Sequence, residues 1–179
     1  LRKLSLLSKA KHILYLVDAC YGGVATIGAR NIDNYMMWSE NDYETKQDYF
    51  QGTTRSNILK KITREKSRQI ISAGGRGEEV IEKAAWGHSA FTKNLLSGLK
   101  DSKADIDRDG IITAHELGAY LKEKVTIDSG DQQTPQSRRF TSHEGEFIFV
   151  LENNKLINQS AASFNQTSSF KLIIIKYDS

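Results

Sequence analysis

The hydrophobic and polar positions of the chain alternate between strand-like and helix-like patterns. Residues 12 to 17 form a continuous apolar run of strand length, which is typical of a parallel strand covered on both faces. Further strands are predicted over residues 68 to 73 and 146 to 151. The first two end in polar or glycine-containing segments, where loops are expected.

Helical patterns lie around these strands. The apolar residues of positions 1 to 11 repeat every three residues and predict a short helix, and a basic helix is predicted over residues 57 to 67. Ser89 is the expected N-cap of a helix over 90 to 99, and another helix is predicted over 114 to 125. This order of elements predicts an α/β protein with a largely parallel sheet.

Two segments have no clear periodicity. Residues 28 to 56 are polar and aromatic and predict a long loop, a feature that is usually functional or mobile in compact domains. Residues 152 to 179 are rich in Asn, Ser and Gln before a final apolar run, so we expect a linker and a strand of a following region. Residues 1 to 151 are then the main domain.

Composition narrows the setting in which the protein works. The 179 residues are 39% hydrophobic and 26% charged, which suits one domain with a real core. The net charge of +3 is not gathered into a basic tract, so nucleic-acid binding is not expected. A single cysteine excludes an internal disulfide, and no apolar run approaches the ~20 residues that span a membrane. We therefore expect a cytoplasmic protein.

Cys20 is the candidate nucleophile. It follows the strand over 12 to 17 within the segment Asp-Ala-Cys-Tyr-Gly-Gly, and functional groups of parallel sheets collect at the carboxyl ends of strands. A thiol at such a loop, near outward-pointing backbone amides, favours a reactive thiolate. The alternative is a buried, inert cysteine.

This segment resembles the nucleophile motif of the caspase-like clan, in the form of metacaspases and bacterial caspase-like peptidases. Later segments resemble the same family in the same order: 71–74, 87–92, 105–117, 133–136 and 145–149. The resemblance covers residues 1 to 151 and implies a caspase-like three-layer sandwich with a mostly parallel central sheet flanked by helices. It also implies a cysteine endopeptidase that works through a Cys-His dyad.

The partner histidine of the dyad is not identified in this chain. In caspases it lies ~50 residues upstream of the nucleophile, and too few residues precede Cys20 for that spacing. His12 belongs to the same strand, about 26 Å from the thiol at about 3.3 Å per residue, and His88, His115 and His143 do not match the family position. We expect the histidine, with half of the oxyanion hole, on an N-terminal portion of the same protein. A degenerate, non-catalytic relative is the alternative.

Asp18 is the candidate substrate-binding residue. Caspases that cleave after aspartate have Gln-Ala-Cys at the nucleophile, whereas Asp18 takes the place of the glutamine here. A carboxylate in the S1 pocket would pair with Arg or Lys at P1 and repel an acidic residue. Alternatively, Asp18 ends the strand or accepts backbone amides. If the S1 pocket does select basic residues, Arg30, Lys46 and Arg55 in the predicted loop are candidate sites of self-cleavage.

Residues 105 to 116 fit the twelve-residue EF-hand pattern, with aspartates at its positions 1, 3 and 5, glycine at 6 and glutamate at 12. Calcium binding is one interpretation, and the ion would be structural and away from the thiol. No cofactor is expected for the chemistry itself. The other is a capping box of Thr113 and Glu116 after a tight turn at 109–110.

Three functions are consistent with these patterns. The first is an endopeptidase that acts on protein or peptide substrates with a basic P1 residue, with Cys20 as nucleophile. The second is a non-catalytic caspase-like scaffold or regulatory module. The third is a calcium-responsive binding domain around residues 105 to 116.

Overall fold

The computed structural model of the chain describes residues 5, 7–19, 55–139, 141–151 and 170–176. Its main sheet has four strands in the order β6-β2-β1-β8. These strands are β1 (His12–Asp18), β2 (Ser67–Ser72), β6 (Gln136–Arg139) and β8 (Phe170–Lys176). Strand β1 is parallel to both β2 and β8, and β6 is antiparallel to β2. The protein is therefore α/β, with a small mixed sheet.

Strand β1 lies inside this sheet, and all seven of its residues are buried. Alternate side chains point to opposite faces, so Leu14 and Leu16 join one apolar cluster while Ile13 and Tyr15 join another. A strand with both faces covered needs apolar residues at successive positions. The strand predicted over residues 12 to 17 is confirmed.

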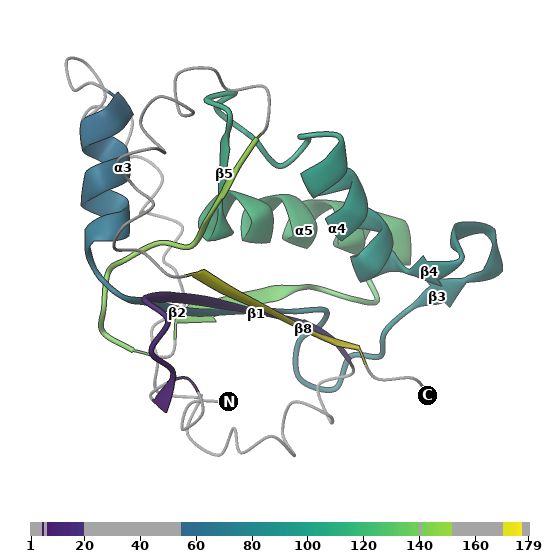
Figure 1. The fold of residues 1–179 in the computed structure, drawn as a ribbon. Coiled ribbons are helices and arrows are strands. Elements are labelled where there is room, and N and C mark those ends of the chain that lie inside the picture. The colour runs from purple at the N-terminus through teal and green to yellow at the C-terminus, as the bar shows by residue number, and fades with distance from the viewer. Residues whose placement is uncertain (1–4, 6, 20–54, 140, 152–169, 177–179) are drawn as a thin grey trace.

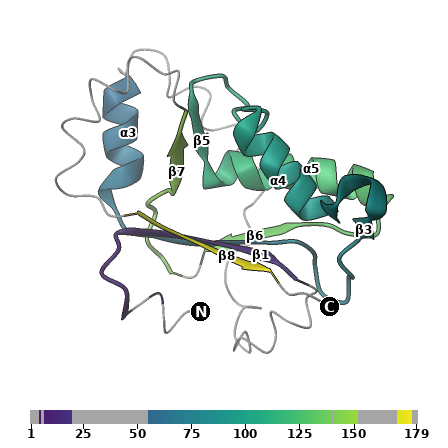
Figure 2. The same cartoon turned by 45° about the vertical axis from the view of Figure 1, so that its right-hand side comes forward.

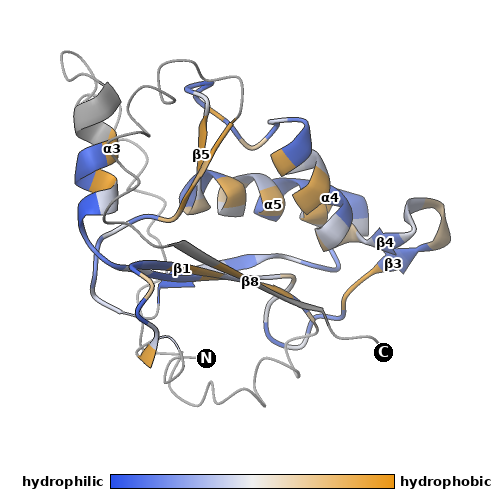
Figure 3. Ribbon diagram, viewed as in Figure 1, coloured by the Kyte–Doolittle hydropathy of each residue, from blue (hydrophilic) through white to orange (hydrophobic). Residues whose placement is uncertain are grey.

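Helices α4 (Ala90–Lys100) and α5 (Ala114–Ser129) lie side by side over one face of the sheet (Figures 1 and 2). Both helices carry mixed hydrophobic and hydrophilic positions, as Figure 3 shows. Their apolar residues, with those of β1 and β2, form the largest core cluster; it includes Leu14, Leu16, Ile71, Phe91, Leu95, Leu117, Leu121 and Val125. Burial of this apolar surface stabilises the packing of both helices on the sheet.

Smaller elements surround these two layers. Helix α3 (Arg55–Arg64) precedes β2, and strands β5 (Ile111–Thr113) and β7 (Ile148–Val150) form an antiparallel pair. Strands β3 (Glu82–Lys83) and β4 (His88–Ser89) form a second antiparallel pair, which leads into α4. The 3₁₀ helix η4 (Ala84–Trp86) connects β3 and β4.

A buried arginine fastens the segment before β1 to the sheet. Arg68 of β2 is 3% exposed, and its guanidinium donates to the carbonyls of Ser5 at 2.9 Å and of Lys11 and Ala10 at 2.8 Å. Multiple carbonyl acceptors compensate a buried guanidinium for lost water. A helix was predicted over residues 1 to 11. Of the described residues in this range, Ser5 and Leu7 are helical and 8 to 11 are not. Leu7 is 82% exposed, so it does not contribute to a buried helix face.

The other predicted elements form with shifted ends. The basic helix is α3 and ends at Arg64, since β2 begins at Ser67, and the last helix extends to Ser129. The strand expected over 146 to 151 is reduced to β7. Among the described residues, no helix is long and apolar enough to cross a membrane.

Candidate active site

Strands β1 and β2 are parallel, so their carboxyl ends lie at the same edge of the sheet. Strand β1 ends at Asp18, and the amide of Ala73, just after β2, donates to the carbonyl of Val17 at 2.8 Å. Cys20 lies outside the described residues, two positions beyond Asp18 in the chain. Residues 28 to 54 of the predicted loop, with Arg30 and Lys46, lie outside them too, whereas Arg55, which was expected in the loop, is the first residue of helix α3.

The Asp18 carboxylate is buried, with 4% of the residue exposed. Its Oδ2 atom accepts hydrogen bonds from the hydroxyls of Ser89 and Thr92, each at 2.6 Å. Its Oδ1 atom is buried and has no hydrogen-bond partner among the described residues. A buried carboxylate oxygen without a donor is costly, so this atom is poised to accept a donor that the described structure does not supply.

Helix α4 presents the two hydroxyls to Asp18. The Ser89 side chain is the N-cap of α4 and accepts the backbone N–H of Thr92 at 2.9 Å, which confirms the predicted cap. The capping bond fixes the first turn of α4, and the hydroxyls of Ser89 and Thr92 lie on the side of this turn that faces Asp18. The oxygen of Ser89 therefore serves two purposes, because it accepts from the helix and donates to Asp18.

Sequence reasoning did not find Ser89 and Thr92 as partners of Asp18. Both lie in the segment over 87 to 92 that resembles the peptidase family, and that resemblance was the only sequence signal of a functional role there. The sequence also allowed a structural role for Asp18, either as the end of the strand or as an acceptor of backbone amides. The described contacts of the Asp18 carboxylate include no backbone amide. Hydroxyls take that place.

The loop that follows β2 leaves the sheet at the same edge and is held by polar side chains. The carboxylate of Glu78 accepts the amides of Gly75 at 2.8 Å and of Thr134 at 2.6 Å. The fully buried Gln133 donates to the carbonyl of Ala73 and accepts the amide of Ile81, both at 2.8 Å. Residues 133 and 134 thus set the path of the loop from 73 to 81.

The four histidines occupy other parts of the described structure. His12 is the first residue of β1, at the opposite end from Asp18, and its Nε2 lies 3.1 Å from the carbonyl of Thr63. His88 is exposed on β4, His115 is in the first turn of α5, and His143 is exposed before β7. The described hydrogen bonds of Asp18 involve no histidine.

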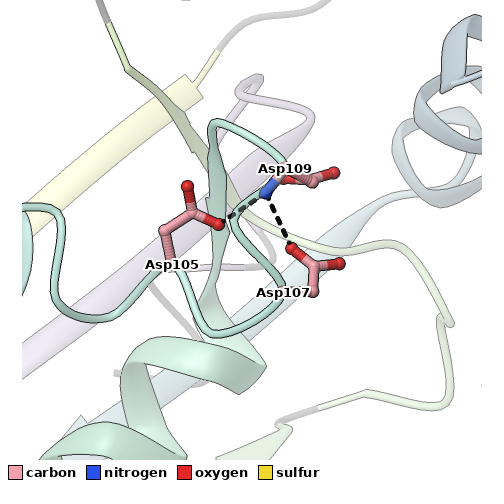
Figure 4. A group of neighbouring side chains, drawn as sticks. All are labelled: Asp105, Asp107 and Asp109. Atoms are coloured by element: carbon pink, nitrogen blue, oxygen red, sulfur yellow. Dashed lines mark hydrogen bonds between the residues drawn. The ribbon is translucent and has the colours of Figure 1, made fainter.

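The acidic loop is organised by its own backbone (Figure 4). The amide of Asp109 donates to carboxylate oxygens of Asp105 at 2.9 Å and Asp107 at 3.1 Å, and ligand oxygens of the three aspartates lie within 4.8 Å of one another. Oxygen donors at this spacing suit a hard divalent cation such as Ca²⁺.

Glu116, the last residue of the EF-hand pattern, points into a capping box. Its carboxylate accepts the backbone N–H of Thr113 at 2.9 Å, and the Thr113 hydroxyl accepts the amide of Glu116 at 3.1 Å. Burial raises the pKa of the Glu116 carboxyl, and the bonds from Thr113 act in the opposite direction. The predicted capping box is confirmed.

Comparison with known proteins gave no match for this chain among family models, curated proteins or solved structures. The functional assignment therefore rests on the residues and their geometry.

Proposed function

We propose that this chain is the nucleophile-bearing part of a caspase-like cysteine endopeptidase that cleaves after Lys or Arg. The observation that carries the proposal is the Asp18 carboxylate, which is buried at the carboxyl end of β1 with Oδ1 lacking a partner among the described residues. It lies two positions before the only cysteine of the chain. A cationic P1 side chain supplies the donor and the charge that Oδ1 calls for.

The proposed reaction follows thiolate chemistry. The Cys20 thiolate attacks the carbonyl carbon after the basic residue, and a histidine outside this chain protonates the departing amine. The resulting thioester is hydrolysed by water, which the same histidine deprotonates. The backbone amide of Cys20 is the proposed donor to the oxyanion from this chain.

We further propose that the chain forms part of a caspase-like three-layer sandwich. Parallel strands β1 and β2, with α4 and α5 over one face, agree with part of a caspase-like three-layer sandwich. The opposite face of β1 is also apolar, through Ile13, Tyr15 and Val17, as a sheet between two layers requires. The upstream portion would add the dyad histidine.

Two substitutions in the full-length protein that contains this chain test the proposal. Cys20→Ala should abolish cleavage of lysyl and arginyl reporter peptides. Asp18→Asn keeps the acceptor oxygen but removes the charge, and should lower kcat/KM for basic peptides by about 100-fold, since loss of a desolvated charge pair is costly. Asp101→Asn, an exposed aspartate at the end of α4, is the matched control. Unchanged cleavage by Asp18→Asn, with a large loss of thermal stability, would show that Asp18 is structural.

A second proposal concerns the loop over 105 to 116, favoured by the proximity of its three aspartates. We propose a structural calcium ion held by Asp105, Asp107 and Asp109. The ion would stabilise the turn before β5 by bridging these carboxylates, and it would take no part in the chemistry at Cys20.

A further inference from the structure

The two oxygens of the Asp18 carboxylate are in unequal positions. Each carboxylate oxygen offers two acceptor sites, and Oδ2 fills both with the hydroxyls of Ser89 and Thr92, at 2.6 Å each. Oδ1 has no partner among the described residues. The carboxylate therefore presents one oxygen, rather than two, to an approaching cation.

This inequality bears on the choice between the two basic side chains. A guanidinium binds a carboxylate best as a fork, with two parallel N–H···O bonds that need both oxygens. An ammonium is a compact charge whose donors rotate, so one well-placed oxygen serves it. A carboxylate with one oxygen already saturated cannot form both bonds to a guanidinium. It can still bind an ammonium through its other oxygen.

We propose that Ser89 and Thr92 are positioning residues which, by saturating Oδ2 of Asp18, make the S1 site accept lysine at least as well as arginine. This inference rests on the proposed peptidase function and adds a determinant to it. Thr92 is the better residue to substitute. Both hydroxyls donate to Asp18, but the Ser89 hydroxyl also caps α4, so its removal would disturb the helix as well.

The test compares matched peptides that differ only in Lys or Arg at P1, cleaved by the full-length protein. The quantity measured is the ratio of kcat/KM for Arg to that for Lys, which does not depend on the fraction of correctly folded enzyme. Thr92→Val removes the hydroxyl at nearly constant volume, and Thr92→Ser restores it. Thr126→Val is the control for a generic Thr→Val change, since its buried hydroxyl has no partner among the described residues.

We expect a wild-type ratio at or below about one, and a rise of about tenfold in Thr92→Val, because one charge-assisted hydrogen bond is gained by Arg alone. Thr92→Ser and Thr126→Val should keep the wild-type ratio. A wild-type preference for Arg of more than about twofold, or a ratio in Thr92→Val within about twofold of wild type, would overturn the inference while leaving the peptidase proposal intact. Absence of cleavage after either residue by the folded, full-length protein would overturn both.

Discussion

The side-chain amide of Gln133 donates to the backbone carbonyl of Ala73 over 2.8 Å, in a site from which water is excluded. The same side chain accepts the backbone amide of Ile81. One residue thus ties together the two ends of the loop that leaves β2 beside Asp18. The loop after β2 is therefore held by a residue from a distant segment, because Gln133 lies 52 positions after Ile81 in the chain.

Replacement of Gln133 by Met should loosen this loop. Methionine has a similar volume but cannot pair with the carbonyl of Ala73 or the amide of Ile81, and each buried group left unpaired costs about 1–3 kcal/mol. Urea unfolding should show a loss of about 2–4 kcal/mol, and hydrogen exchange should show faster exchange at the amide of Ile81. Gln136→Met is the control, because it loses one bond to Thr134 in a partly buried site. Unchanged exchange at Ile81 would contradict this account of the loop.

The buried His12 predicts a pH dependence of stability. Burial, followed by the charge of Lys11, lowers its pKa to about 4, with a further lowering by Arg68 and opposing contributions from backbone groups of Thr63 and Glu146. Between pH 6.5 and 4 the unfolded chain binds a proton that the folded protein does not. The free energy of unfolding should therefore fall as the pH drops through this window, by on the order of 3 kcal/mol.

His12→Gln isolates this contribution, because glutamine does not titrate. Urea unfolding of both proteins between pH 4 and 7.5 should give curves that converge as the pH falls, with wild type losing more stability. Parallel curves would mean that His12 does not supply the pH dependence.

The calcium proposal predicts a measurable gain in stability. Excess Ca²⁺ should raise the Tm of the full-length protein by a few degrees over its value in EGTA, since a ligand at 100 times its Kd adds about 2.7 kcal/mol. Asp105→Asn should remove the difference, and Asp131→Asn, at an exposed position after α5, should keep it. Equal Tm values in Ca²⁺ and EGTA would leave the loop as a turn that leads into the capping box.

Local patterns in the sequence were enough to predict several elements. Strand β1 follows from its unbroken apolar run, because a strand buried on both faces has no polar alternation. The Ser89 cap and the capping box of Thr113 and Glu116 follow from short-range hydrogen bonds within one helical turn. For the two caps the determining contacts lie within a few residues.

Contacts between distant segments were not predictable in the same way. The hydroxyls that bind Asp18 come from 71 and 74 positions away, and no local pattern encodes that meeting. The pairing of β8 with β1 was likewise unforeseen, because an apolar strand after residues 152–169 can join any sheet edge. The antiparallel β6 is short and polar, so it carries no strand period.

The most direct test of the central claim is covalent labelling of Cys20 in the full-length protein. A peptidyl acyloxymethyl ketone with Lys at P1 should alkylate the Cys20 thiol, and peptide mass spectrometry should place the adduct there. The same reagent with Asp at P1 should react at least about tenfold more slowly, because the Asp18 carboxylate repels it. Equal labelling by the two reagents, or an adduct with the Lys reagent at a residue other than Cys20, would contradict the account.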